Sequence, residues 1–135
     1  MLYGKEHVEK YEETDGRVGY EWENGTTILL LHTTGRSSGK ERINPLIFRE
    51  WDRDYLVVAS KGGDDDAPDW FKNIEKDPDV EVQIKGEKFK ARARTATPSE
   101  KPAMWQHMVD AWPDYSEYQK KTSRNIPVVV LERAA

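Results

Sequence analysis

The sequence contains no cysteine, which excludes disulfide bonds, thiolate nucleophiles and zinc sites with cysteine ligands. It also lacks a long apolar run, because none of its hydrophobic stretches approaches the roughly 20 residues that a membrane-spanning helix requires. Positive charge is not in excess either: the net charge is −4, so we expect no extended surface for nucleic acid. These absences predict a soluble, cytoplasmic protein in which residues 1–135 form one domain, and in which any anion site is local.

Six segments have the β-branched or alternating apolar pattern of strands. They are residues 26–34, 41–49, 55–60, 80–84, 89–93 and 126–131. The first three follow one another closely, which favours an antiparallel meander, and Pro45 inside the second indicates an edge position or a bulge. Lys85-Gly86 fits a tight turn between the fourth and fifth segments, and the sixth is apolar enough to be buried on both faces.

Helical spacing occurs between these strands. Apolar side chains at residues 70–74 follow Pro68 with helical spacing, and residues 97–100 have the form of a capping box in front of an apolar stripe that ends at Trp112. A short helical stretch is expected at residues 114–121, and residues 7–13 are weakly helical. About six mostly antiparallel strands with two or three helices predict a small α+β barrel.

Residues 33–42, TTGRSSGKER, form a glycine-rich link between the first two predicted strands. The segment contains the G-x-S-x-G pattern of a serine-hydrolase nucleophile elbow, but that motif needs a helix directly after the serine, where this sequence predicts a strand. A phosphate-binding P-loop needs four residues between its glycines and a hydroxyl residue after the lysine, whereas this segment has three and then Glu41. Two interpretations stay open: a turn whose backbone N–H groups and cations hold an anion, and an ordinary solvated hairpin turn.

Two further clusters bear on function. Ser60-Lys61-Gly62-Gly63 follows the third strand as Gly35-Arg36 follows the first, so the two cationic strand ends are expected to share one rim, where barrels bind ligands. Trp112, Tyr115 and Tyr118 have the spacing that lines one side of a helix, for which core packing is the ordinary use.

Five segments together resemble the deazaflavin-dependent nitroreductase family, which consists of F420-dependent oxidoreductases of the split β-barrel (FMN-binding-like) superfamily. They are HVEKYEETDGRVGYEW (residues 7–22), TTGRSSGKERINPLIF (33–48), LVVASKGG (56–63), PDWFKNI (68–74) and WPDYSEYQKKTSRNIPVVVLE (112–132). The resemblance implies a split barrel that binds coenzyme F420, an 8-hydroxy-5-deazaflavin, and passes its hydride to a quinone or to a nitroaromatic or nitroimidazole-type acceptor.

The resemblance also implies roles for individual residues. By position, the contacts to the phosphate and oligoglutamate tail fall on Arg36, Ser37, Lys40, Arg42 and Lys61. The deazaflavin ring would lie along Ala59, Ser60 and Lys61, near Asn44, Asp69, Trp70 and Asn73. The acceptor side falls on Trp112, Tyr115 and Tyr118, with Ser60 facing the same pocket. The chain departs from the family pattern at Ser37, where a second cation is usual, and in the acidic run at residues 64–66.

Two classes of function remain. The preferred one is a reductase in which the cofactor carries the hydride, so that no metal, cysteine or catalytic triad is required. Proton delivery to the acceptor would then come from Ser60, Tyr115, Tyr118 or water. The alternative is a non-catalytic split-barrel module that binds a flavin or deazaflavin. The oligomeric state and any peripheral contact with a membrane are open at this point.

Overall fold

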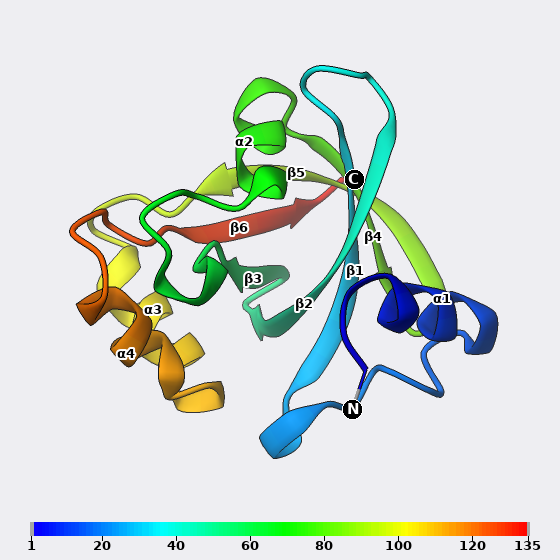
Figure 1. Cartoon of the computed structure of the whole chain (residues 1–135), viewed down its shortest axis with the longest axis horizontal. Coiled ribbons are helices and arrows are strands. Elements are labelled where there is room, and N and C mark those ends of the chain that lie inside the picture. Colours follow the sequence, from blue (N-terminus) through cyan, green and yellow to red (C-terminus); the bar gives the residue numbers. More distant parts are fainter. Residues whose placement is uncertain (1, 135) are drawn as a thin grey trace.

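The computed structural model describes residues 2–134, in which six antiparallel strands close into one barrel with the order β1-β2-β3-β6-β5-β4 (Figure 1). The strands are β1 (Thr27–Thr34), β2 (Glu41–Trp51), β3 (Asp54–Val58), β4 (Asp79–Ile84), β5 (Glu87–Thr95) and β6 (Val128–Arg133). The helices are α1 (Gly4–Thr14), α2 (Asp69–Lys76), α3 (Lys101–Ala111) and α4 (Asp114–Lys120), with short 3-10 turns at Glu23–Gly25 (η1) and Lys61–Gly63 (η2).

This architecture confirms the predicted α+β barrel with six strands, including the meander of β1, β2 and β3 and the hairpin of β4 and β5 around Lys85-Gly86. The expected number of helices was too low, because the described chain has four α-helices rather than two or three. The extra helix is α1, in which charged residues dominate and only His7, Val8 and Tyr11 are buried. No helix within residues 2–134 combines the length and the apolar character needed to cross a membrane.

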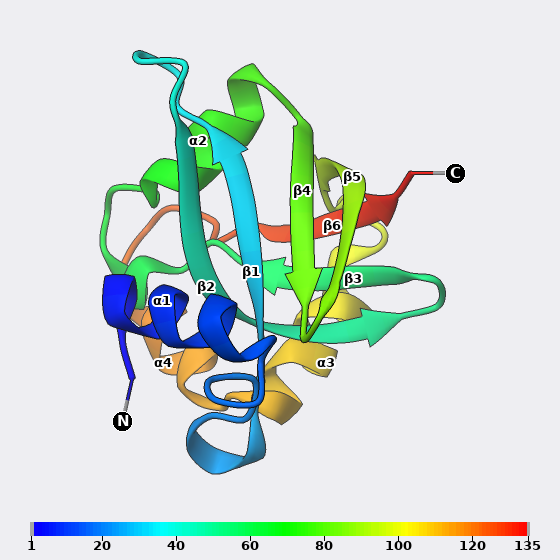
Figure 2. The same cartoon turned by 90° about the vertical axis from the view of Figure 1, so that its right-hand side faces the viewer.

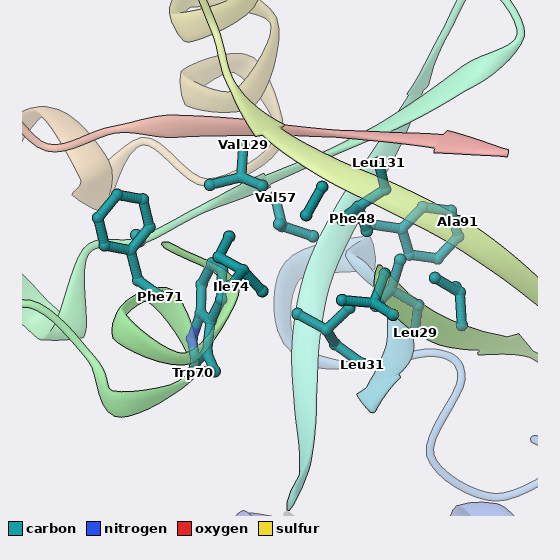
Figure 3. Packing of buried hydrophobic residues seen from close by; sticks show 14 of the residues in the cluster. Leu29, Leu31, Phe48, Val57, Trp70, Phe71, Ile74, Ala91, Val129 and Leu131 are labelled. Atoms are coloured by element: carbon teal, nitrogen blue, oxygen red, sulfur yellow. The ribbon is translucent and has the colours of Figure 1, made fainter. Parts of the chain in front are cut away.

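The core occupies the inside of the barrel and continues under the helices. Figure 3 shows Leu29, Leu31, Val129 and Leu131 among the buried side chains of the inner cluster. On the outer side of β6, Val128 and Val130 pack in a second cluster with Met104 and Met108 of α3. The sixth strand is therefore buried on both faces, as its composition predicts.

Helix α3 begins where the sequence predicts a capping box. The backbone N–H of Thr97 donates to Oε1 of Glu100 at 2.9 Å, and the N–H of Glu100 donates to Oγ1 of Thr97 at 3.3 Å. The Arg94 guanidinium donates to both carboxylate oxygens of Glu100, at 2.7 and 2.9 Å. These bonds tie the start of α3 to β5, and Pro113 separates its end from α4.

The barrel is split along the seam between β2 and β3. Only Arg49, Glu50 and Trp51 of β2 pair with β3, whereas residues 41–48 pair with β1 alone. Val57 and Val58 of β3 pair with β6 and have no partner in β2. Pro45 lies in the stretch of β2 with one unpaired side, which confirms the predicted edge position. The first half of β2 therefore offers a free strand edge, and its residues 42–47 line two clefts.

Helix α1 lies across β1 and β2 (Figure 2). Val8 and Tyr11 of α1 pack on Ile28 and Leu30 of β1. The hydroxyl of Tyr11 donates to the carbonyl of Ile28 at 3.0 Å and accepts the backbone N–H of Lys85 at 2.7 Å, so it links the helix to β1 and to the turn between β4 and β5. This packing places the start of the chain next to the split.

Candidate functional site

Two clefts lie along the split, and Trp70 of α2 lines both of them. The first, which we call the cationic cleft, has a volume of about 380 Å³ and lies beside the loop that joins β1 and β2. The second, the aromatic cleft, has a volume of about 300 Å³ and lies at the end of β3. The indole of Trp70 packs at the edge of the core cluster in Figure 3, so a rigid side chain joins the two clefts.

The cationic cleft collects many of the residues that the sequence assigns to cofactor binding. It is lined by Gly35, Arg36, Ser37, Ser38, Arg42, Ile43, Asn44, Asp69, Trp70 and Asn73. Lys40 is exposed and is not among these lining residues. The link at residues 33–42 is a hairpin turn into β2, and no helix follows Ser37, so the nucleophile-elbow and P-loop interpretations are excluded by the structure as well as by spacing.

Arg36 is held on the first turns of α2. Its Nη1 donates to Oδ1 of Asn73 at 2.9 Å, and its Nη2 donates to Oδ1 of Asp69 at 3.1 Å. Its backbone N–H also donates to Oδ1 of Asn73, at 3.1 Å, and its carbonyl accepts Nζ of Lys76 at 2.6 Å. Asn73 is buried, and its amide donates to Oγ1 of Thr33 at 3.1 Å. Asp69 and Asn73 therefore fix the shape of the loop.

Arg42 is the cation of this cleft whose charge is least compensated. It stands opposite Thr33 in the register of β1 and β2, and its side chain is exposed. Among residues 2–134, no carboxylate forms an ion pair with Arg42 or with Lys40, whereas Arg36 is paired with Asp69. An anion entering this cleft would therefore meet the free guanidinium of Arg42 first.

The second strand end, Ser60 to Gly63, borders the aromatic cleft. Arg124, from the segment between α4 and β6, fixes this strand end, because its guanidinium donates to the carbonyls of Ala59 at 3.2 Å and Ser60 at 2.9 Å. Ala59 is fully buried in the inner core cluster and lines neither cleft. The two cationic strand ends thus lie on separate clefts joined by Trp70, rather than together on one rim.

Gly63 positions the helix that carries the tyrosines. Its backbone is left-handed, with φ at 86°, and a Cβ at this position would lie 2.5 Å from the carbonyl oxygen of Tyr118. A side chain would therefore push α4 away from η2. The paired glycines of the SKGG segment thus serve the placement of Tyr118 as well as the turn itself.

One residue of the acidic run after SKGG, Asp66, is paired with two lysines. Oδ1 of Asp66 accepts Nζ of Lys72 at 2.7 Å, and Oδ2 of Asp66 lies 3.7 Å from Nζ of Lys61. The hydrogen bond from Lys72 lowers the pKa of Asp66. Asp66 therefore compensates part of the charge of Lys61, which lines the aromatic cleft.

The three aromatic residues of the C-terminal cluster meet on one wall of the aromatic cleft. Nε1 of Trp112 donates to the hydroxyl of Tyr118 at 3.3 Å, and the rings of Tyr115 and Tyr118 are 6.1 Å apart in an edge-to-face contact. Tyr115 is only 5% exposed and belongs to the cluster under α3, so it packs in the core while it lines the cleft. Burial raises the pKa of Tyr115, so its hydroxyl stays protonated to a higher pH than that of an exposed tyrosine.

A second part of the lining of the aromatic cleft was not anticipated from the sequence. It consists of Leu2, Tyr3, Gly4 and His7 at the start of the chain, together with Trp22 before η1. Arg124 was missed as well, although it lies inside one of the quoted segments. Both omissions involve contacts between residues far apart in the chain, for which an isolated sequence carries no periodic signal.

Comparison with known proteins identifies the family of the chain. The sequence profile of the F420H2-dependent quinone reductase family matches residues 3–133. The chain is 38% identical over 130 residues to an F420H2-dependent quinone reductase of Mycobacterium tuberculosis (strain ATCC 25618 / H37Rv), covering 94% of this chain and 87% of that protein.

Two solved structures are similar in both sequence and fold. One, described as an F420-H2 dependent reductase, has a TM-score of 0.72 and 42% identity, and the match covers 78% of this chain and 93% of the other. The second, described as a domain-swapped dimer, has a TM-score of 0.75 and 39% identity over 95% of this chain and 96% of the other.

Proposed function

The chain belongs to the F420H2-dependent quinone reductase family, whose cofactor is coenzyme F420, and from this premise we propose that it passes a hydride from the reduced cofactor to a quinone or a nitroaromatic compound. One observation carries the proposal. A cationic cleft and an aromatic cleft share Trp70 and the free edge of β2, so they can receive the anionic tail and the flat ring of one molecule.

The cationic cleft suits the tail by its donors. A phosphodiester and a glutamate chain need cations and N–H or hydroxyl groups, which form charge-assisted hydrogen bonds with them. Arg42 supplies an uncompensated guanidinium, and Ser37 and Ser38 supply hydroxyls at the same cleft. Lys61, whose contact with Asp66 is long at 3.7 Å, is available for a second anionic group. Arg36 contributes charge from a position fixed by Asp69 and Asn73.

The aromatic cleft suits the ring and the acceptor. It is lined by Ser60 and Lys61, by Pro45 to Ile47 of β2, and by Trp112, Tyr115 and Tyr118. When bound, the reduced deazaflavin supplies the hydride. The protein has to hold donor and acceptor in contact and keep water away from them, which an apolar and aromatic cleft does.

We assign the proton donor to Tyr118, with Ser60 and Tyr115 as further candidates. Because the Tyr118 oxygen already accepts the indole N–H of Trp112, its own O–H is left to donate to an acceptor oxygen in the cleft. The Ser60 hydroxyl has no hydrogen bond among the described side-chain contacts, and Ser60 lines the same cleft. Tyr115 stays neutral but is held in the core, which limits its reach.

A turnover experiment tests the proposal. Catalytic amounts of the protein are mixed with reduced coenzyme F420 and menadione, and the reoxidation of the coenzyme is followed by its absorbance. Many turnovers per protein molecule are expected, with the same assay on a nitroaromatic acceptor to test that part of the range. A spectral change limited to one equivalent of coenzyme would identify a non-catalytic binding module instead.

A further inference from the structure

The N-terminal residues and the η1 segment form one unit around Trp22. Nε1 of Trp22 donates to the carbonyl of Leu2 at 2.9 Å, and the ring of Tyr3 meets the indole edge-to-face at 5.6 Å. The Tyr3 hydroxyl donates to Oε2 of Glu23 at 2.9 Å, and Nε2 of His7 lies 2.8 Å from the carbonyl of Gly19. Trp22 is thus held in place from several sides.

This unit contacts the C-terminal aromatic residues at the aromatic cleft. The indole rings of Trp22 and Trp112 are 5.5 Å apart, with an angle of 34° between their planes. Both residues line the cleft, and both are half-buried. Trp112 in turn is hydrogen-bonded to Tyr118. The cleft is therefore bridged by two indoles that come from separate parts of the fold.

The small volume of the aromatic cleft limits the size of the acceptor that can bind beside the two indoles. About 300 Å³ is at the lower end of the range for small-molecule sites, yet a hydride transfer requires a tricyclic ring and an acceptor in contact. A compact ring that packs against the two indoles gains aromatic contacts. An acceptor whose long chain left the cleft on this side would have to separate Trp22 from Trp112 and lose their contact.

We propose that Trp22 is a specificity-determining residue that selects compact, flat acceptors over acceptors with a long isoprenoid chain. This inference rests on the proposed quinone reduction. It adds a residue from the N-terminal part of the chain to a proposed acceptor site that otherwise consists of Ser60, Trp112 after α3, and the two tyrosines of α4. Trp22 contributes an aromatic wall for the ring and closes the route that a long chain would take.

The test compares wild-type protein with Trp22→Ala, Trp22→Phe and a matched control, Trp51→Ala. Trp51 is a half-buried tryptophan that packs on His107 and does not line the aromatic cleft, so its loss tests for general effects of removing an indole. Two acceptors are used: menadione, and a naphthoquinone with a four-unit isoprenoid chain kept in detergent. The readouts are kcat/KM for each acceptor and the dissociation constant of menadione from quenching of indole fluorescence.

We expect Trp22→Ala to raise the kcat/KM ratio of long-chain quinone to menadione by about 10-fold or more, the usual scale for opening or filling part of a pocket. Trp22→Phe keeps a smaller ring, is less disruptive to folding, and should raise the ratio by about 3-fold. Both variants should bind menadione more weakly, and Trp51→Ala should leave the ratio unchanged. A ratio within twofold of wild type in both folded Trp22 variants would overturn the inference. Failure of wild-type protein to reduce either quinone would overturn the proposed function instead. The menadione titration would then still test whether Trp22 contributes to the binding of a flat ring.

Discussion

Replacing Gly63 by alanine should destabilise the protein much more than the same change at Gly62. Both glycines have left-handed backbone, with φ at 86° and 63° respectively, so both alanines meet the penalty of about 1–2 kcal/mol for that conformation. They differ in what the new methyl group meets. At position 63 it would lie 2.5 Å from the carbonyl oxygen and 2.9 Å from Cα of Tyr118, whereas at position 62 no atom lies within 4 Å.

The difference between the two variants isolates the contact with α4. Overpacking typically costs about 1–3 kcal/mol, so we expect a loss of about 1–2 kcal/mol for Gly62→Ala and about 2–5 kcal/mol for Gly63→Ala. Urea denaturation measures both losses, provided that the slopes of the two transitions agree with the wild-type slope. Gly63→Ala should also displace Tyr118 and raise the Michaelis constant for menadione. Equal losses in the two variants would refute the argument, because they would show that α4 moves away from η2 without cost.

Three further predictions concern cofactor, acceptor and pH. Arg42→Ala or Lys61→Ala should weaken coenzyme F420 binding by ~1.5–3 kcal/mol, the scale of a charge-assisted hydrogen bond, in a fluorescence titration. Unchanged affinity in both variants would show that neither residue contacts the coenzyme. Tyr118→Phe should lower kcat and leave coenzyme affinity intact. Tyr115→Ala truncates a core aromatic side chain and should cost ~3–5 kcal/mol of stability as well as activity. A melting temperature close to wild type for Tyr115→Ala would contradict the burial of this side chain. Burial raises the pKa of Tyr11 from 10.0 to about 12, so the folded state holds this proton more tightly than the unfolded chain does. The contribution of this proton to stability should be full below pH 10 and should fall as the pH rises to about 12. The urea midpoint of Tyr11→Phe should therefore decline less over this pH range than the wild-type midpoint does.

The strands could be predicted because each has its own local signal. Alternation marks β4 and β5, and continuous apolar character marks β6, whose two faces are covered by the inner core and by α3. The antiparallel pairs β1–β2, β2–β3 and β4–β5 follow from the short links between those strands. The sequence indicated only weak helical character for α1 because most of its residues are charged and its apolar stripe is narrow. The helix is stabilised by the packing of Val8 and Tyr11 on β1.

The candidate site was predictable only where its residues lie near one another in the sequence. The glycine-rich strand ends and the C-terminal aromatics are local patterns, and the structure gathers most of them along the split. The bonds from Arg124 to the carbonyl of Ala59 and the contact between Trp22 and Trp112 join distant segments. Such pairings depend on how the barrel closes, and they have no signature in either segment alone. The roles of the individual residues in binding and catalysis stay predictions for the experiments described above.

The open edge of β2 also fixes the distance between the two ends of the site. Arg42 lines the cationic cleft and Ile47 lines the aromatic cleft, so a single extended strand connects them. At about 3.4 Å per residue, these five steps span about 17 Å. A flexible loop could stretch or shorten that span, but a strand paired with β1 over residues 41–48 cannot. Deleting one residue between Arg42 and Ile47 would shorten the span by one step and turn every later side chain to the opposite face. Substitutions that change the lining of one cleft can therefore leave the other unaltered, while the pairing of β2 with β1 fixes the separation between the two clefts.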